Sequence, residues 1–429
     1  MVGGGASGTI LAAQLARRGV PNVLIDGSGR IGKGVAYSTT EAVHVLNVRA
    51  EAMSAWSGEP DHFATRFEAE GGDRRGFAER RLFAAYLGEM LKEAVASGCT
   101  RMIEKSAVSG TVNGDAWTIG FDDDSSIDAR ALVLATGNQE PDMLSEFRDV
   151  GWRFIRNPWG DEARAAIEQA ASGDEAVLLV GTGLTMIDLA LSLHAAGHEG
   201  KIVALARRGL APRAHADFEP APVALEEVPK GSVRALSRWL RRRGAQVGWR
   251  AAVDSLRPHS HALWQSLGAG EQRRFLRHAR PWWDVHRHRI APEVAATVAR
   301  MIGEGRLEIV AGRIVSAEET NEGLTVEFRR RGRAIPQSMS FAYAFNCSGP
   351  LHSIARSRDP LLRSLLDAGA VRPDHLGIGL EADGTSRAGE HLWAMGPLTK
   401  ARYWEITAVP DIREQAAAIA DDIKRELGK

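Results

Sequence analysis

The chain contains the same glycine-rich pattern twice. VGGGASGTILAAQLARRG, at the N-terminus, aligns with VGTGLTMIDLALSLHAAG, which begins at Val180, and pairs Gly3 with Gly181 and Gly5 with Gly183. In each copy a glycine-rich turn precedes small and apolar residues at helical spacing, and a glycine then ends the helix. Such a turn and helix open a βαβ unit. We therefore predict an α/β fold with two Rossmann-like dinucleotide-binding domains.

The two copies differ in what comes before the turn. Ala176–Val180 is a continuous apolar run, typical of a central parallel strand that is buried on both faces. Only Met1 and Val2 precede the first turn, so we expect the first strand of that domain to be truncated. The second copy departs from the G-x-G-x-x-G pattern in its own way, because Met186 replaces the third glycine.

The residues after each predicted helix indicate different ligands. The short apolar run 22–25 ends in Asp26, about 20 residues after the first glycines, where a carboxylate accepts hydrogen bonds from a ribose. The run 201–206 ends instead in Arg207 and Arg208, and guanidinium groups suit a 2′-phosphate. We predict FAD at the first site and NADPH at the second, with NADH as the alternative. An ordinary solvated pair is the competing interpretation of the two arginines.

Two further apolar runs end in tight turns. Residues 130–137 end in Thr136 and Gly137, and residues 341–350 end in Ser-Gly-Pro. We predict buried strands there and place Thr136 and Gly137 at the cofactor. The predicted domains are an FAD-binding part over residues 1–145, an NAD(P)H-binding domain over 146–330 with a helical insertion at about 210–302, and the returning part of the FAD domain with a C-terminal helix over 331–429.

Charge and cysteine content exclude several classes of function. Lys plus Arg and Asp plus Glu number 54 each, so the whole chain has no electrostatic attraction to nucleic acid or to an acidic membrane. Cys99 and Cys347 form no C-x-x-C, which argues against a disulfide framework, a zinc site or a dithiol redox pair. No apolar run reaches the roughly 20 residues that span a bilayer. We expect a soluble cytoplasmic protein; its oligomeric state does not follow from the sequence.

The predicted insertion is rich in arginine, tryptophan and histidine. It contains SRWLRRRGAQVGWR and RHARPWWDVHRHRIAP, without a recognised nucleic-acid-binding motif. His286 and His288 are two residues apart, which is not the spacing of a helical metal pair, and we predict no metal. We expect a cap that packs Trp282 and Trp283 and pairs Asp284 with arginines.

The sequence resembles the bacterial FAD/NAD(P)-binding flavoproteins that include an FAD-dependent urate hydroxylase and are akin to N-hydroxylating and Baeyer–Villiger-type monooxygenases. The matching stretches run in order along nearly the whole chain: VGGGASGT, GVAYSTTEAVHVLNVRAEAMSAW, LATG, VGTGLTMIDLALSL, ARRGLAPRAH, WWDVHRHRIAP, NCSGP and WEITAVPDIREQA. The residues that would hold FAD are Gly3, Gly5, Ser7, Gly8, Asp26, Asn47, Met53, Ser54, Gly396 and the helix that starts at Pro410. The residues that would hold NADPH are Gly181, Gly183, Leu184, Thr185, Arg207 and Arg208.

This resemblance implies an FAD-dependent, NAD(P)H-using oxidoreductase, and we expect a monooxygenase. It would hydroxylate a small polar substrate, for example a urate-like heterocycle, with molecular oxygen through a flavin C4a-hydroperoxide. Arg402 and Glu405 are weak catalytic candidates, as an anion-binding and a proton-transferring group, and a structural salt bridge is the alternative. Two other functions remain open: a flavin reductase or amine N-hydroxylase, and a degenerate, non-catalytic flavin-binding or interaction module.

Overall fold

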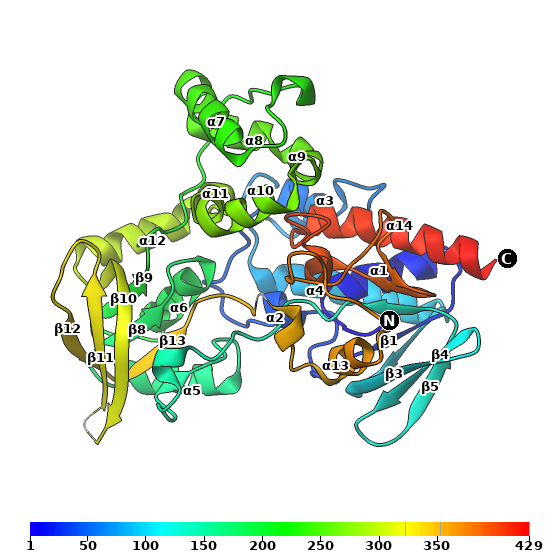
Figure 1. The fold of residues 1–429 in the computed structure, drawn as a ribbon, viewed down its shortest axis with the longest axis horizontal. Helices are drawn as coiled ribbons and strands as arrows, with labels where there is room; N and C mark the ends of the chain where they lie inside the picture. The colour runs from blue at the N-terminus through cyan, green and yellow to red at the C-terminus, as the bar shows by residue number, and fades with distance from the viewer. Residues whose placement is uncertain (322, 352, 429) are drawn as a thin grey trace.

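The computed structural model describes residues 1–321, 323–351 and 353–428. They form two α/β units with a helical layer above them (Figure 1). The fold class is the predicted one. The strands of the first unit are β1 (Asn22–Ile25), β2 (Thr100–Ile103), β6 (Leu132–Leu134), β14 (Arg387–Gly389) and β15 (Leu392–Ala394). β1 pairs with β2 and β6 pairs with β15 in parallel, and β14 pairs antiparallel with β15.

The first three residues lie between β1 and β6. Val2 forms parallel bridges to Ile25 and to Leu134, and its backbone N–H donates to the Val133 carbonyl at 2.9 Å. The Gly3 N–H donates to the Ile25 carbonyl at 2.8 Å. Residues 1–3 therefore take the central position of the first sheet, directly before the glycine-rich turn.

Helices cover one face of this sheet, and a β-meander with one helix covers the other. The helices of the first face are α1 (Ala6–Arg17), α4 (Arg80–Ala96) and α14 (Val409–Leu427), with the short α2 (Gly34–Tyr37) and α3 (His62–Ala69) beside them. They share a hydrophobic core with Met53, Trp56 and Trp393. The opposite face carries β3 (Ala107–Asn113), β4 (Ala116–Phe121), β5 (Ser126–Ala129) and α13 (Pro360–Asp367).

The second unit is built on a seven-stranded sheet in the order β12-β11-β10-β9-β8-β13-β7. Its strands are β7 (Phe154–Ile155), β8 (Val177–Val180), β9 (Ile202–Ala206), β10 (Leu307–Thr320), β11 (Gly323–Arg330), β12 (Gln337–Phe341) and β13 (Tyr343–Asn346). β8 is central, as its apolar run predicted: Val177 and Leu179 pack toward one face, and Leu178 and Val180 toward the other. β12 pairs with β11, and β13 pairs with β8. The second sheet therefore extends to Asn346, beyond the domain boundary expected at residue 330.

The insertion consists of short helices that stand off from both sheets (Figure 1). They are α7 (Val233–Val247), α8 (Trp249–Ser255), α9 (Ser260–Ser266), α10 (Ala269–Arg274), a π-helical turn (Phe275–Ala279) and α11 (Arg280–Arg287). α12 (Pro292–Gly303) does not belong to this layer, because Val294, Val298 and Met301 join the core of the second unit. The insertion therefore ends near residue 291 rather than 302.

Over the part of the chain that the structure describes, no helix combines the length and hydrophobicity that crossing a bilayer requires.

Candidate cofactor and active site

The glycines of the first turn are required by close backbone packing. Gly3 has φ +105°, and a Cβ there would overlap the Ala135 carbonyl oxygen at the end of β6. A Cβ at Gly8, in the first turn of α1, would overlap the carbonyl oxygen of Gly3. Gly5 is the N-cap of α1 and supplies no side chain. Glycine at these positions lets the chain turn sharply from the sheet into the helix.

The N-terminus of α1 is suited to an anionic group. No acidic residue occupies its first turn and no side chain caps it. Across from it lies Gly396, with φ +61°, where a Cβ would stand 2.9 Å from Ser7 Oγ. The buried hydroxyl of Thr136 has no hydrogen-bond partner among the described residues. Free helix N–H groups, a glycine cradle and an unpaired hydroxyl fit the pyrophosphate of a dinucleotide.

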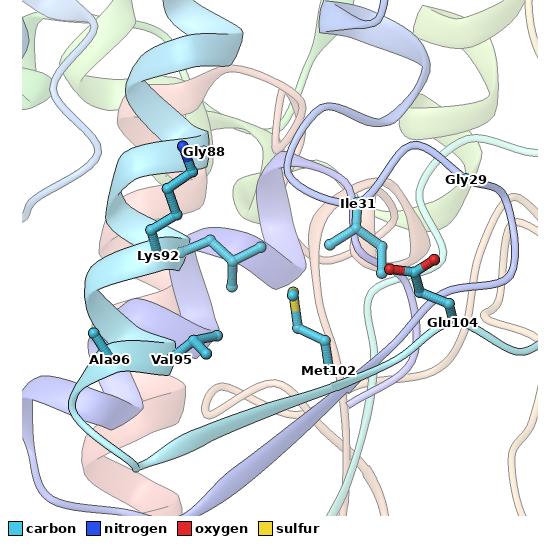
Figure 2. A pocket seen from close by; sticks show the side chains of 9 residues that line it. Gly29, Ile31, Gly88, Lys92, Val95, Ala96, Met102 and Glu104 are labelled. Atoms are coloured by element: carbon cyan, nitrogen blue, oxygen red, sulfur yellow. The ribbon is translucent and has the colours of Figure 1, made fainter.

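Asp26 lies where a ribose-binding carboxylate is expected. Its Oδ2 accepts the Gly4 N–H at 2.6 Å, and its Oδ1 accepts the Ser28 N–H at 2.7 Å. Three residues further along, at Gly29, begins a pocket of about 470 Å³. Figure 2 shows that Gly88, Lys92, Val95 and Ala96 approach it from one helix, with Met102, Ile31 and Glu104 on the other side. The lining of this pocket is mainly apolar.

Of the other predicted FAD residues, Met53 and Pro410 lie close to α1, whereas Asn47 lies near α6 and the insertion. Met53 is buried in the core beside α1. Ser54 Oγ donates to the Glu59 carbonyl at 2.6 Å, so its hydroxyl is engaged within its own turn. The Asn47 carbonyl accepts a 3.1 Å hydrogen bond from His215 Nε2. Pro410 stands in the first turn of α14, which packs against α1.

The second glycine turn repeats the geometry of the first. Gly181 has φ +130°, and a Cβ there would overlap the Cys347 carbonyl oxygen at the end of β13, as Gly3 would overlap Ala135. Gly183 is exposed at the N-cap of α6 (Leu184–Ala195), which begins with the half-buried Leu184 and Thr185. Met186 is fully buried between α6 and the sheet, so a large apolar side chain takes the position of the third glycine.

Arg207 and Arg208 follow β9, which lies beside β8. Arg207 is exposed and Arg208 is half-buried. Neither makes a hydrogen bond or ion pair with any residue that the structure describes. Two guanidinium groups without partners at this strand end are available to a phosphate.

A buried ion pair that the sequence did not indicate joins the two units. Arg80, at the start of α4, donates to Asp188 Oδ1 of α6 at 2.9 Å, with side-chain exposures of 16% and 8%. Beside it, His44 is buried and its ring lies 3.0 Å from Ser192 Oγ, measured at Nε2. Asp188 lies five residues after Gly183, so this network holds the second glycine turn against the first unit.

The two weak catalytic candidates differ in their surroundings. Glu405 is buried with φ +73°; its Oε1 accepts the Trp283 Nε1–H at 2.5 Å and its Oε2 accepts from Arg287 Nε at 3.1 Å. These bonds form a salt bridge between α11 and the segment before α14, the alternative considered for Glu405. Arg402 is half-buried, and its Nε lacks a partner among the described residues.

Titratable groups gather where α11 meets this segment. Lys400 Nζ donates to Asn138 Oδ1 at 2.8 Å, and burial together with the nearby Arg280 lowers the pKa of Lys400 to about 8. Burial raises the pKa of Asp284, although Arg280 Nε donates to it at 3.2 Å. The pairing of Asp284 with an arginine matches the expectation. Trp283 packs against a hydrophobic cluster as expected, whereas Trp282 is 50% exposed.

Cys347 lies beside the second glycine turn. Burial raises the pKa of its thiol far above the ordinary value. Since the thiolate is the reactive form, this cysteine contributes packing rather than chemistry.

Residues 1–139 match the family model described as FAD-NAD(P)-binding. No curated protein sequence matches the chain. Among solved structures, the fold is similar to L-lysine 6-monooxygenase from Pseudomonas syringae (TM-score 0.70, 16% identity, covering 99% of this chain and 98% of that one). It is also similar to the Kutzneria ornithine N-hydroxylase with reduced FAD, NADP+ and L-ornithine (TM-score 0.66, 15% identity, covering 99% of this chain and 98% of that one). A third similar structure is the bacillithiol disulfide reductase of Staphylococcus aureus (TM-score 0.60, 14% identity, covering 99% of this chain and 97% of that one).

These findings agree with the predicted fold class. The N-terminal third matches an FAD-NAD(P)-binding family model, and the whole chain shares its fold with the L-lysine 6-monooxygenase and with the bacillithiol disulfide reductase. The fold is consistent with the expected resemblance to N-hydroxylating monooxygenases, and none of the matches reported above is a urate hydroxylase.

Proposed function

We propose that this protein is an FAD-dependent, NAD(P)H-using monooxygenase that hydroxylates a small polar substrate with molecular oxygen. The observation that carries the proposal is the pair of glycine turns with matching backbone geometry but different flanking residues, Asp26 at one and Arg207 with Arg208 at the other. One turn suits FAD and the other suits a phosphorylated nicotinamide dinucleotide. When bound, FAD would supply the redox chemistry and the activation of oxygen.

The protein's own residues would bind and orient the two cofactors. Gly3, Gly5 and Gly8 would admit the FAD pyrophosphate to the N-terminus of α1, while Thr136 and Ser7 would offer hydroxyl groups to it. Asp26 would accept hydrogen bonds from the ribose, and the adenine would extend toward the pocket at Gly29 and Ile31. Gly181 and Gly183 would admit the NADPH pyrophosphate to the N-terminus of α6.

Amine N-hydroxylation is the second candidate, because two of the similar solved structures are N-hydroxylases of lysine and ornithine. A flavin reductase is the third: the similar bacillithiol disulfide reductase has this fold, whereas the present chain has no C-x-x-C for dithiol chemistry. The three candidates predict different products from the same reduced cofactor.

The test is a flavin spectrum of the purified protein, followed by a screen of purines and amines for NADPH oxidation. We expect a yellow protein in which one substrate stimulates NADPH and oxygen consumption in equal amounts and appears as a hydroxylated product. Peroxide formation that no substrate suppresses would identify a reductase. A protein that stays colourless after reconstitution with FAD would contradict the proposal and favour a non-catalytic module.

The coenzyme preference tests the role of the two unpaired arginines. We expect the Arg207→Ala, Arg208→Ala variant to lose about 100-fold or more in kcat/KM for NADPH, because each of the two charge-assisted bonds to a 2′-phosphate contributes about 1.5 to 3 kcal/mol. Its kcat/KM for NADH should stay within about twofold, and steady-state kinetics with both coenzymes gives the comparison. Equal losses for both would show that the arginines do not contact the 2′-phosphate.

A further inference from the structure

The insertion carries an excess of positive charge that the rest of the chain balances. Residues 210–291 contain 15 lysines and arginines but 7 aspartates and glutamates, whereas the whole chain has 54 of each kind. The excess is concentrated in α7, whose sequence VRALSRWLRRRGAQV contains five arginines and no acidic residue. Figure 1 shows α7 at the outer end of the insertion, away from both sheets. This basic helix therefore belongs to the outer surface of the insertion.

Four of the five arginines form a stripe along one exposed face of α7. Their spacing of four, three and one residues places them within roughly 100° of the helix circumference. The members of this arginine stripe are Arg234, Arg238, Arg241 and Arg242, and all four are exposed. The opposite face of α7 packs against a hydrophobic cluster through Leu236, Trp239 and Leu240. Because the apolar face is packed against the protein, the arginine stripe faces the solvent.

The charges of the arginine stripe are not compensated within the described part of the chain. None of the four side chains forms a hydrogen bond, an ion pair or a ring contact there. Arg243, outside the stripe, donates instead to the Ala221 carbonyl at 3.3 Å. Arg238 lies four residues from both Arg234 and Arg242, and like charges at this spacing destabilise a helix. Negative charges placed along the stripe would relieve this repulsion.

The residue types and their spacing favour an acidic protein helix as the source of these charges. Guanidinium groups are weakly hydrated and bind carboxylates through two hydrogen bonds. A helix that lies along α7 can present carboxylates at the same spacing, as charged residues do between paired helices. A membrane or a single-stranded nucleic acid would also use exposed apolar or aromatic side chains, and α7, which the structure describes in full, exposes no large hydrophobic residue.

We propose that the arginine stripe of α7 is the docking surface for an acidic helix of a partner protein. The start of α7 is held by two acceptors: Ser232 Oγ accepts the Ala235 N–H at 3.3 Å, and Glu271 Oε2 accepts the Val233 N–H at 2.8 Å. The stripe is thus ordered before a partner arrives, which lowers the entropic cost of binding. This inference goes beyond the proposed oxidoreductase function and does not rest on it, because no residue of the stripe belongs to either predicted cofactor site.

The experiment measures the binding of a fluorescein-labelled helical peptide by fluorescence anisotropy at pH 7. The peptide is as long as α7 and carries glutamates on one face at the spacing of the stripe. The control peptide has the same composition, with its glutamates spread around the helix. We expect the first peptide to bind at least about fivefold more tightly than the second, because only its charges can all meet the stripe at once. Raising the salt from about 50 mM to about 300 mM should weaken this binding, since exposed ion pairs are screened.

Substitution of the stripe tests its role directly. The variant combines Arg234→Gln, Arg238→Gln, Arg241→Gln and Arg242→Gln, and we expect it to bind the first peptide about tenfold or more weakly, because four charge pairs are lost together. Its Tm should be unchanged or higher, since glutamine is a good helix former and the like-charge pairs are gone. The matched control replaces four exposed arginines of the second unit that also form no ion pair with a described residue, and it should bind like the parent protein: Arg313, Arg329, Arg331 and Arg333.

Four outcomes would overturn the inference. They are no binding of the first peptide, equal binding of both peptides, equal weakening in the stripe and control variants, and tighter binding of a DNA duplex or of phosphatidylserine vesicles that is lost in the stripe variant. The last would assign the stripe to a nucleic acid or to a membrane. A protein that never takes up FAD would refute the proposed function without affecting peptide binding, so the two failures are distinguishable.

Discussion

At Gly8, the helix backbone comes so close to the preceding turn that a methyl group has no space. A Cβ there would overlap the carbonyl oxygen of Gly3, which is backbone and has no rotamer with which to move aside. The same applies to Gly181 in the second turn, against the Cys347 carbonyl. The packing of the backbone by itself therefore requires glycine at these positions.

We expect Gly8→Ala to lower the free energy of unfolding by about 3 kcal/mol, because overpacking of this size forces the helix away from the sheet. FAD occupancy should fall with it. Urea titration and the ratio of flavin to protein absorbance measure the two effects. Gly270→Ala, in α10 with open space around the added carbon, is the control and should stabilise by about 0.5 to 1 kcal/mol. Equal stability of the two variants would contradict the packing argument.

At the scale of elements, the link between α4 and α6 sets how the two glycine turns face each other. Arg80 and Asp188 are both largely buried and bonded at 2.9 Å, and Arg80 Nε also donates to the Val45 carbonyl at 3.2 Å. The loop that contains Val45 contacts α6 a second time through His44 and Ser192. Three segments that are distant in the sequence are therefore fixed by one polar network.

Removing one partner of this pair should cost more than removing both. Asp188→Leu leaves the Arg80 guanidinium buried without its carboxylate, and we expect a loss of about 3 to 5 kcal/mol. The double variant Arg80→Met, Asp188→Leu should recover most of that loss, since no charge then remains in the interface. Urea unfolding of the four proteins in a double-mutant cycle gives the coupling energy. Additive losses would mean that the two side chains contribute independently.

At the scale of the whole molecule, His215 connects the insertion to both units. Its backbone N–H donates to the Ile290 carbonyl at 2.9 Å, its Nε2 bonds to the Asn47 carbonyl, and its ring lies 4.8 Å from that of Phe77. The pKa of His215 is lowered from 6.5 to about 4, mainly by burial; the charges of Arg289 and Arg49 act in the same direction, whereas the hydrogen bond to the Asn47 carbonyl and the charge of Asp254 oppose the shift. The folded protein therefore favours the neutral form of the His215 ring.

The lowered pKa of His215 makes the stability of the folded protein decrease at acidic pH. Between about pH 4 and 6.5 the unfolded chain binds a proton at His215 that the folded protein does not, so stability falls as the pH falls through that window and is unaffected above it. After allowance for partial solvent access, we expect a loss of about 1 to 2 kcal/mol. His215→Gln keeps a donor for Asn47 and should show a shallower decline in urea titrations from pH 7 to 4.5. Exposed His278→Gln should decline like the parent protein.

The sequence by itself determined the two α/β units and the geometry of their glycine turns, because backbone close approach and hydrophobic periodicity are local properties. Gly3 and Gly181, which align in the sequence, make equivalent close approaches in the structure: Gly3 to the Ala135 carbonyl and Gly181 to the Cys347 carbonyl. Only the tertiary structure decided that Lys400 meets Asn138 and that Arg80 meets Asp188, over sequence separations of 262 and 108 residues. Such contacts depend on how one unit docks against another. The fold was therefore predictable from the spacing of residues, whereas these side-chain contacts depend on the packing of segments that are distant in the sequence.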